Sequence, residues 1–169
     1  MRSRLGIAVV LLVQIGILVA IPFRAARARL TGTAITLETG PVDPFDPLSG
    51  YYVTLDYVAE RPPESTESFR VGEPLWVTVE KGEPAWKPIS VTRERPAPSA
   101  NRVSLRGRFD GGRARIEEAS RFFIPEDRRT EVDDLLRAAR QHALVDLRVG
   151  EDGTPAPVRL RVGGKSIGG

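Results

Sequence analysis

The sequence contains no cysteine and only one histidine, His142. Without cysteine the chain can form neither a disulfide framework nor a thiolate metal site. A lone histidine has no second imidazole with which to share a zinc ion, and a Ser-His-Asp triad would have to be built around it. We therefore expect no metal, no cofactor and no catalytic residue, and hence no enzymatic activity.

Negative charge is missing from the first 30 residues, because all 22 acidic residues lie after Leu30. Five of the 25 basic residues lie in that first segment, so the rest of the chain has 20 basic and 22 acidic residues. Nucleic-acid binding needs a coherent basic face. The arginines between Arg93 and Arg115 instead partly alternate with apolar residues, as on the solvated face of a strand. We expect no nucleic-acid partner; an anionic or lipid-headgroup partner for these arginines is the alternative.

Long apolar runs are also scarce, and the chain has one, from Leu5 to Phe23. These 19 residues include no charge and one polar side chain, Gln14, and arginines flank both ends. A helix of this length reaches about 28 Å, close to the bilayer's hydrocarbon thickness of about 30 Å. We therefore predict a membrane anchor that contacts the lipid bilayer through residues 5–23. The anchor segment occupies residues 1–30, and one domain occupies residues 31–169.

A cleaved signal peptide is the alternative to an anchor, because Ala26-Arg27-Ala28 has the small-x-small pattern of a cleavage site. The apolar run is longer than the roughly 7–15 residues of a signal peptide, and arginines surround the site, so we favour an uncleaved anchor. Arginines balance on the two sides of the run. The positive-inside rule therefore leaves the orientation undecided.

Apolar and polar residues alternate with a period of two over much of the remaining chain, which predicts strands. The predicted strands are residues 33–38, 52–57, 75–80, 86–92, 103–109, 113–117, 143–149 and 157–162. Asp110-Gly111-Gly112 suits a tight hairpin, and Pro88 favours an edge strand. The glycine-rich tail after residue 162 gives no further strand signal.

Residues 126–141 change to a helical period, with one apolar stripe formed by Val132, Leu135, Leu136 and Ala139. Pro125 suits the first turn of such a helix, and Glu126 lies near its positive N-terminal end. The predicted fold class is therefore mainly β with one packed amphipathic α-helix (α+β), plus an N-terminal transmembrane helix.

Two blocks of sequence resemble a known family. Residues 41–44 read PVDP and residues 50–57 read GYYVTLDY, which together resemble the GDYXXLXY family of bacterial membrane-anchored proteins. Tyr51 replaces the aspartate of that motif, and Phe45 and Ser49 replace the basic residues usual in the preceding loop. The second block, residues 121–126, reads RFFIPE and is similar to the family's aromatic run before Pro-Glu. The residues that match the family pattern are Asp43, Gly50, Tyr52, Leu55, Tyr57, Arg121, Phe123, Pro125 and Glu126.

The resemblance implies an extracytoplasmic domain on an N-terminal anchor, often encoded beside multi-span membrane proteins, and it carries no established activity. It favours a single-pass protein of the inner (plasma) membrane with its C-terminal domain outside the cytoplasm. Any reaction that required the aspartate replaced by Tyr51 would be disabled in this chain.

The motif residues themselves have a structural interpretation. Leu55 and Tyr57 share one face of a strand, so we expect Leu55 in the core and the tyrosines at its borders, each phenol with a hydrogen-bond partner. Asp43, Asp46 and Asp56 offer oxygen ligands for calcium, but their spacing is not that of a recognised loop, and turn-forming aspartates are the favoured interpretation.

The leading functional hypothesis is a binding or scaffolding accessory to an integral membrane protein. One alternative is an envelope serine peptidase in which Ser49 is the nucleophile and Lys81 the base, although the charged turn around Lys81 would keep its amine solvated. Another is a small-ligand or polysaccharide-binding module, which needs Tyr51, Tyr57, Trp76 and Trp86 to line one open groove.

Overall fold

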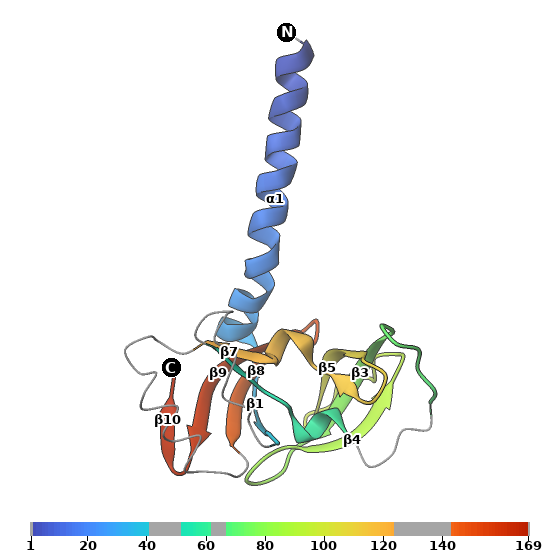
Figure 1. The fold of residues 1–169 in the computed structure, drawn as a ribbon, viewed down its shortest axis with the longest axis vertical. Coiled ribbons are helices and arrows are strands. Elements are labelled where there is room, and N and C mark those ends of the chain that lie inside the picture. Colours follow the sequence, from blue (N-terminus) through green and yellow to red (C-terminus); the bar gives the residue numbers. More distant parts are fainter. Residues whose placement is uncertain (1, 41–51, 62–66, 124–142, 169) are drawn as a thin grey trace.

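A long helix stands on a body made of strands (Figure 1). The computed structural model describes residues 2–40, 52–61, 67–123 and 143–168. Helix α1 (Arg2–Thr31) includes the predicted span of residues 5–23 and continues past it into the body. Within α1, the stretch Val9–Thr31 is long and apolar enough to cross a membrane. The body is mainly β, which confirms the predicted fold class.

The first sheet has the order β1-β8-β9-β10 and is antiparallel throughout. Its strands are β1 (Thr33–Glu38), β8 (Leu144–Val149), β9 (Pro155–Val162) and β10 (Lys165–Ile167). The alternation of the sequence matches the burial, because Ile35 and Leu37 of β1 are buried and face the core with Val145 and Leu147 of β8. The predictions for β1 and for the β8–β9 pair are confirmed.

The second sheet has the order β4-β3-β5-β6. Its strands are β3 (Pro74–Glu80), β4 (Lys87–Thr92), β5 (Arg102–Phe109) and β6 (Ala114–Arg115). The hairpin around Asp110 is confirmed: Asp110 and Arg113 close the turn, and Gly111 has a φ of +98°. Pro88 lies in β4, at the edge of the sheet as predicted, which is where sheets tolerate a residue without an N–H.

A third pair of strands and two 3₁₀ turns complete the body. Strand β2 (Tyr52–Thr54) pairs with β7 (Arg121–Phe123), η1 spans Val58–Glu60 and η2 spans Glu117–Ala119. The turn η1 contacts β1, β3 and β4, whereas η2 contacts β5, β7 and β9. Both turns therefore lie where the two large sheets meet, and the buried side chains of all three sheets form one core.

Two backbone contacts join the large sheets. The amide of Trp86 donates to the carbonyl oxygen of Thr36 in β1 at 2.8 Å, and the amide of Arg106 in β5 donates to Gly153 at 3.0 Å. Gly153 has a φ of +82°, and a Cβ there would collide with the Trp76 ring. The β8–β9 turn can approach β3 this closely only because it has glycine at that position.

Two predicted segments differ from the structure, and a third lies outside the described residues. The predicted strand 52–57 ends at Thr54. The amide of Leu55 still donates to Ser120, next to β7, but Tyr57 then bridges to Thr39, next to β1, so the segment does not continue one ladder. The tail does form a strand, β10, which follows Gly163 and Gly164, both with positive φ. The predicted helix over residues 126–141, together with His142, lies outside the described residues.

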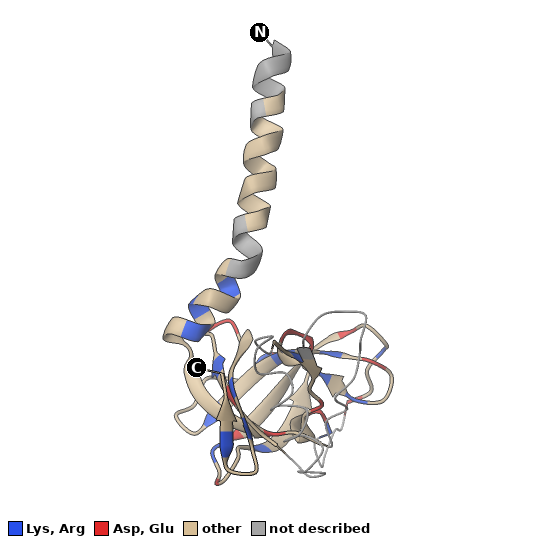
Figure 2. Ribbon diagram, turned by 60° about the vertical axis from the view of Figure 1, so that its left-hand side comes forward, with Lys and Arg blue, Asp and Glu red and all other residues tan. Residues whose placement is uncertain are grey.

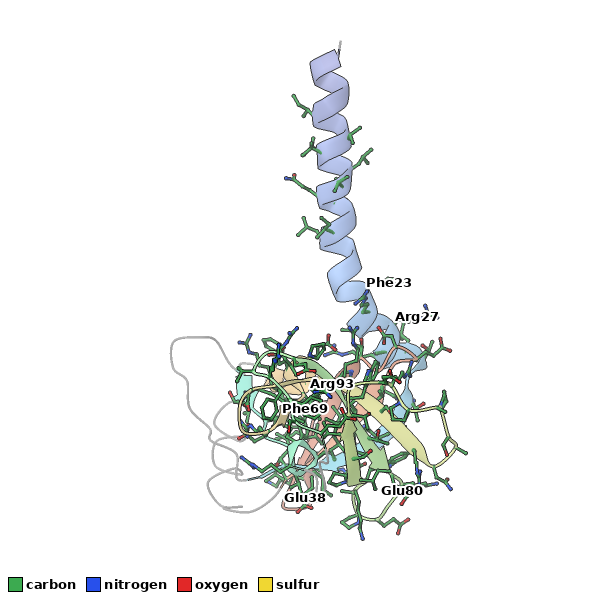
Figure 3. The ribbon with its side chains drawn as sticks, turned by 90° about the vertical axis from the view of Figure 1, so that its right-hand side faces the viewer. Phe23, Arg27, Glu38, Phe69, Glu80 and Arg93 are labelled. Carbon is green, nitrogen blue, oxygen red and sulfur yellow. The ribbon has the colours of Figure 1, made fainter. Side chains whose placement is uncertain are left out.

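The surface carries mixed charge (Figure 2). In one cluster, Arg93 lies over the ring of Phe69 at 5.2 Å and pairs with Glu73 at 2.6 Å and Glu67 at 3.2 Å (Figure 3). These contacts fasten the segment before β3 onto the end of β4. Ion pairs this exposed each stabilise a fold by about 0–1 kcal/mol, so the cluster positions the segment more than it stabilises the body.

Candidate functional site

The two sequence blocks that resemble the family meet directly in the fold. Strand β2 from the first block and β7 from the second are antiparallel partners, with Tyr52 opposite Phe123 and Thr54 opposite Arg121. In β7 the alternation turns Phe122 inward, where it is 6% exposed, and turns Phe123 outward, where it is 70% exposed. The aromatic residue that enters the core is therefore the neighbour of the one that matches the family pattern.

Leu55 and Tyr57 follow β2 and are both completely buried. The Tyr57 hydroxyl donates to the carbonyl oxygen of Ala119 at 2.9 Å, which ties the motif to η2. The phenol has the partner that the sequence predicts, but Tyr57 lies inside the core and not at its border. Burial, together with the negative charge of Glu60, raises the pKa of Tyr57 well above its ordinary value.

Glu60 closes η1 and is a completely buried carboxyl group. Its Oε1 accepts a hydrogen bond from the amide of Ile116 at 2.9 Å. Its Oε2 has no hydrogen bond, and the nearest cation is Nε of Arg113 at 3.6 Å. Burial raises the pKa of Glu60, and the Ile116 amide and the charge of Arg113 offset that rise only in part.

Arg113 connects the motif to the hairpin of β5 and β6. Its side chain is 15% exposed, its Nη1 donates to Oδ2 of Asp56 at 2.7 Å, and its Nε lies 3.4 Å from Oδ2 of Asp110. Burial would raise the pKa of Asp110, but hydrogen bonds from the amides of Gly112 and Arg113 outweigh it and lower that pKa. One guanidinium thus faces three carboxyl groups from two segments that are far apart in sequence.

This cluster of Asp56, Tyr57, Glu60, Asp110 and Arg113, here called the motif lock, has the chemistry of a structural clamp. Its phenol and guanidinium are held by protein partners, and Glu60 is sealed from solvent. A general acid or base must reach the reacting atom of a substrate. Glu60 has no exposed surface through which to do so, and the described residues contain no group of three or more metal-ligating side chains.

Several of the residues that the sequence analysis singled out lie outside the described residues. Asp43, Gly50, Pro125 and Glu126 lie outside the described residues, as do Tyr51, Asp46 and Ser49. Tyr52 and Arg121 are placed in β2 and β7. Of the three aspartates considered for calcium, Asp56 pairs with Arg113.

Sequence reasoning missed Glu60 and Arg113. The available signal was an acidic residue at the end of the run Tyr57-Val-Ala-Glu60, directly after the motif. Its basic partner lies more than fifty positions later, after the Asp-Gly-Gly turn, and no local period links the two. A single sequence therefore gives no way to pair them.

The comparisons with known proteins establish the family. A family model described as GDYXXLXY protein matches residues 14–160, which is most of the chain. The chain belongs to the GDYXXLXY family. No curated protein and no solved structure matches the chain. In this GDYXXLXY protein, the last leucine and tyrosine of the motif are core residues, and the motif leads into a buried carboxyl group.

Proposed function

We propose that this protein is a membrane-anchored extracytoplasmic domain that binds or scaffolds a multi-span membrane protein. The observation that carries the proposal is the continuous passage of α1 into the body. The last turns of α1 contact β8 and β9, and Ala28 is 1% exposed. If α1 spans a bilayer, the body is held against the membrane surface and is not displayed on a flexible stalk.

Specific contacts hold the foot of α1 in place. The amide of Gly32 donates to Ala28 at 2.8 Å, and the guanidinium of Arg148 donates to the Gly32 carbonyl oxygen at 3.1 Å. A Cβ on Gly32 would lie 2.8 Å from the carbonyl oxygen of Val149, so the chain passes against β8 with no room for a side chain. Arg27 adds an exposed ion pair to Glu151 at 3.7 Å. Helix and body therefore behave as one unit.

The same contacts support an anchor that is not removed. Ala28 ends the small-x-small pattern of the alternative cleavage site, yet it lies in the helix. It also packs against Gly150, because a Cβ added to Gly150 would lie 3.4 Å from the Cβ of Ala28. Cleavage after Ala28 would uncover the surface of β8 and β9 that the helix covers. Together with the family resemblance, this favours an inner-membrane protein with its body on the extracytoplasmic side.

A groove over β3, β5 and η2 is the surface that we assign to the partner. Trp76, Arg106 and Glu118 are among its lining residues. Partial burial raises the pKa of Glu118 despite the nearby charges of Arg106 and, from α1, Arg24. The Arg106 guanidinium is exposed and makes no hydrogen bond or ion pair with residues that the structure describes. An aromatic ring and an arginine that lacks an ion pair among the described residues, close to a membrane, suit contact with a loop of an integral membrane protein.

No observation favours the alternative functions. Lys81 is exposed in the turn after β3, where its amine is solvated, and Ser49 lies outside the described residues. Tyr57 is completely buried, so it does not line an open groove with Trp76 and Trp86.

Affinity purification after photo-crosslinking tests the proposed partner. The tagged full chain is extracted from its own membranes in a mild detergent, with a photo-reactive amino acid at position 106. We expect one integral membrane protein to be crosslinked, and we expect Arg106→Glu to reduce its recovery in parallel uncrosslinked samples at least several-fold.

Lys165→Glu is the matched control, because Lys165 begins β10 beside the turn that Figure 1 places at the end of the body away from α1. Its charge reversal should leave recovery unchanged. Recovery of the wild-type chain alone from several detergents, with no crosslinked membrane protein, would contradict the proposal.

Accessibility labelling tests the orientation. Because the chain lacks cysteine, Lys81→Cys introduces a single thiol at an exposed site. A membrane-impermeant maleimide should label it in intact spheroplasts. Labelling only after lysis would place the body in the cytoplasm.

A further inference from the structure

Gln14 is the polar residue at the centre of the apolar run from Leu5 to Phe23, with nine residues on either side. Its side chain is exposed on α1, and it makes no hydrogen bond to any residue that the structure describes. If α1 spans the membrane, this carboxamide lies near the middle of the hydrocarbon. The ends of the run are each about 14 Å away along the helix, too far for a glutamine side chain to reach the headgroups.

A carboxamide in hydrocarbon needs a protein partner. It has two N–H donors and one carbonyl acceptor, and no water is present there to satisfy them. Polar side chains inside transmembrane segments therefore face other protein, and glutamine hydrogen-bonds across helix pairs. Gln14 thus marks the side of α1 that contacts another helix.

The residues around Gln14 form a suitable face. Ile7, Val10 and Ile17 repeat with Gln14 at alternating spacings of three and four residues, the heptad spacing of two helices that pack along their length. These three side chains are 61%, 56% and 56% exposed on α1. The face is apolar and β-branched on both sides of one polar position, so the glutamine fixes the register in which a second helix can lie.

We propose that α1 pairs in parallel with the α1 of a second copy of this chain, with the two Gln14 carboxamides hydrogen-bonded to each other. A second copy fits because a carboxamide is both donor and acceptor and because two identical anchors place it at the same depth. Figure 2 shows the described strands of the body to one side of the foot of α1, and no described element covers the other side. This inference rests on the proposed function, since it requires α1 to span the membrane.

Energy transfer between full-length chains in phosphatidylcholine vesicles tests the pairing. Chains that carry Lys81→Cys are labelled with a donor or an acceptor fluorophore, and the transfer is followed as the protein-to-lipid ratio is lowered. We expect the wild-type chain to pair and Gln14→Leu to raise the dissociation constant about 3- to 30-fold. Gln14→Asn, which keeps the carboxamide, should retain part of the pairing.

The matched control moves the glutamine without changing composition. In the double variant Leu12→Gln with Gln14→Leu, the carboxamide lies about 200° around the helix from its natural position. We expect this variant to dissociate as readily as Gln14→Leu. The inference is overturned if the double variant pairs as tightly as the wild type, or if Gln14→Leu does.

A wild-type chain that stays monomeric at every protein-to-lipid ratio also overturns the inference. So does recovery of the chain from its own membranes with a different membrane protein but without a second copy of itself. Alkaline carbonate extraction of the same vesicles distinguishes a failure of the anchor from a failure of the pairing. If the wild-type chain is extracted, the anchor itself is wrong. If it is retained but monomeric, only the pairing is wrong.

Discussion

At the scale of single residues, the motif lock explains why a tyrosine and a glutamate are buried side by side. The Tyr57 hydroxyl donates to the carbonyl oxygen of Ala119. Glu60 accepts a hydrogen bond from the Ile116 amide and faces Arg113. Each group holds the segment after β2 against a different part of the body. A buried polar group with a partner stabilises a unique arrangement, and the same group without one is costly.

Tyr57→Phe tests the first of these contacts. The ring stays in place, but the carbonyl oxygen of Ala119 loses the donor that lies 2.9 Å away. We expect the free energy of unfolding to fall by about 0.5–2 kcal/mol, as measured by chemical denaturation of the full chain in detergent. Ser166→Ala, which removes an exposed hydroxyl group, is the control and should stay within about 0.5 kcal/mol of the wild type. Equal stability of Tyr57→Phe and wild type would show that the hydrogen bond contributes nothing.

Glu60→Gln tests the burial of the carboxyl group through pH. Burial raises the pKa of Glu60 in the folded state, so its contribution is full at pH values below the ordinary glutamate pKa and is lost as the pH rises through the raised pKa. Glutamine cannot ionise and can keep the hydrogen bond from Ile116. We expect the free energy of unfolding to depend less steeply on pH in Glu60→Gln than in the wild type. At the high end of that window, the free energy of unfolding of the variant should exceed that of the wild type.

The pH profile is measured by denaturation at a series of pH values. Glu151→Gln, at a side chain 94% exposed, controls for the loss of one surface carboxylate. Parallel profiles for wild type and Glu60→Gln would mean that the buried carboxyl group carries no such linkage.

At the scale of elements, the close approach of the β8–β9 turn to β3 sets the angle between the two sheets. Gly153 donates its amide to Gly150 and accepts from the amide of Arg106, so it belongs to the turn and to the junction at once. The Trp76 ring occupies the space that a side chain would need. The junction therefore leaves no room for a Cβ atom at position 153.

Gly153→Ala should lower the free energy of unfolding by about 1–3 kcal/mol, because alanine is strained at a φ of +82° and its Cβ meets Trp76. The control is Gly112→Ala in the turn between β5 and β6, where a Cβ would find open space. Thermal unfolding followed by tryptophan fluorescence compares the two. Similar melting temperatures for the two variants would contradict this account of the junction.

Period-two alternation was sufficient to predict most strands, because one face of each strand is buried, as with Leu75 and Val77 in β3. It failed where tertiary contacts decide the backbone. The chain leaves the β2–β7 ladder after Leu55, where Tyr57 bridges to Thr39 and donates its hydroxyl to Ala119. The turn before β10 was readable in principle, since consecutive glycines suit a tight hairpin. The pairing of Glu60 with Arg113 was not, because it depends on the whole fold.

At the scale of the whole molecule, the feature that matters is how α1 meets the body. A tethered domain on a loose linker could sample many orientations, whereas here buried Ala28 and the Gly32 contacts fix the direction of the helix relative to the strands. If α1 spans a bilayer, a helix fixed in this way presents one side of the body to the lipid surface.

Alkaline carbonate extraction of membranes from cells that make the full chain, followed by intact-mass measurement of each fraction, tests the central claim most directly. We expect the chain to stay with the membrane pellet at the mass of the whole sequence, with the α1 segment present. A soluble product that begins after Ala28 and is absent from the pellet would contradict it.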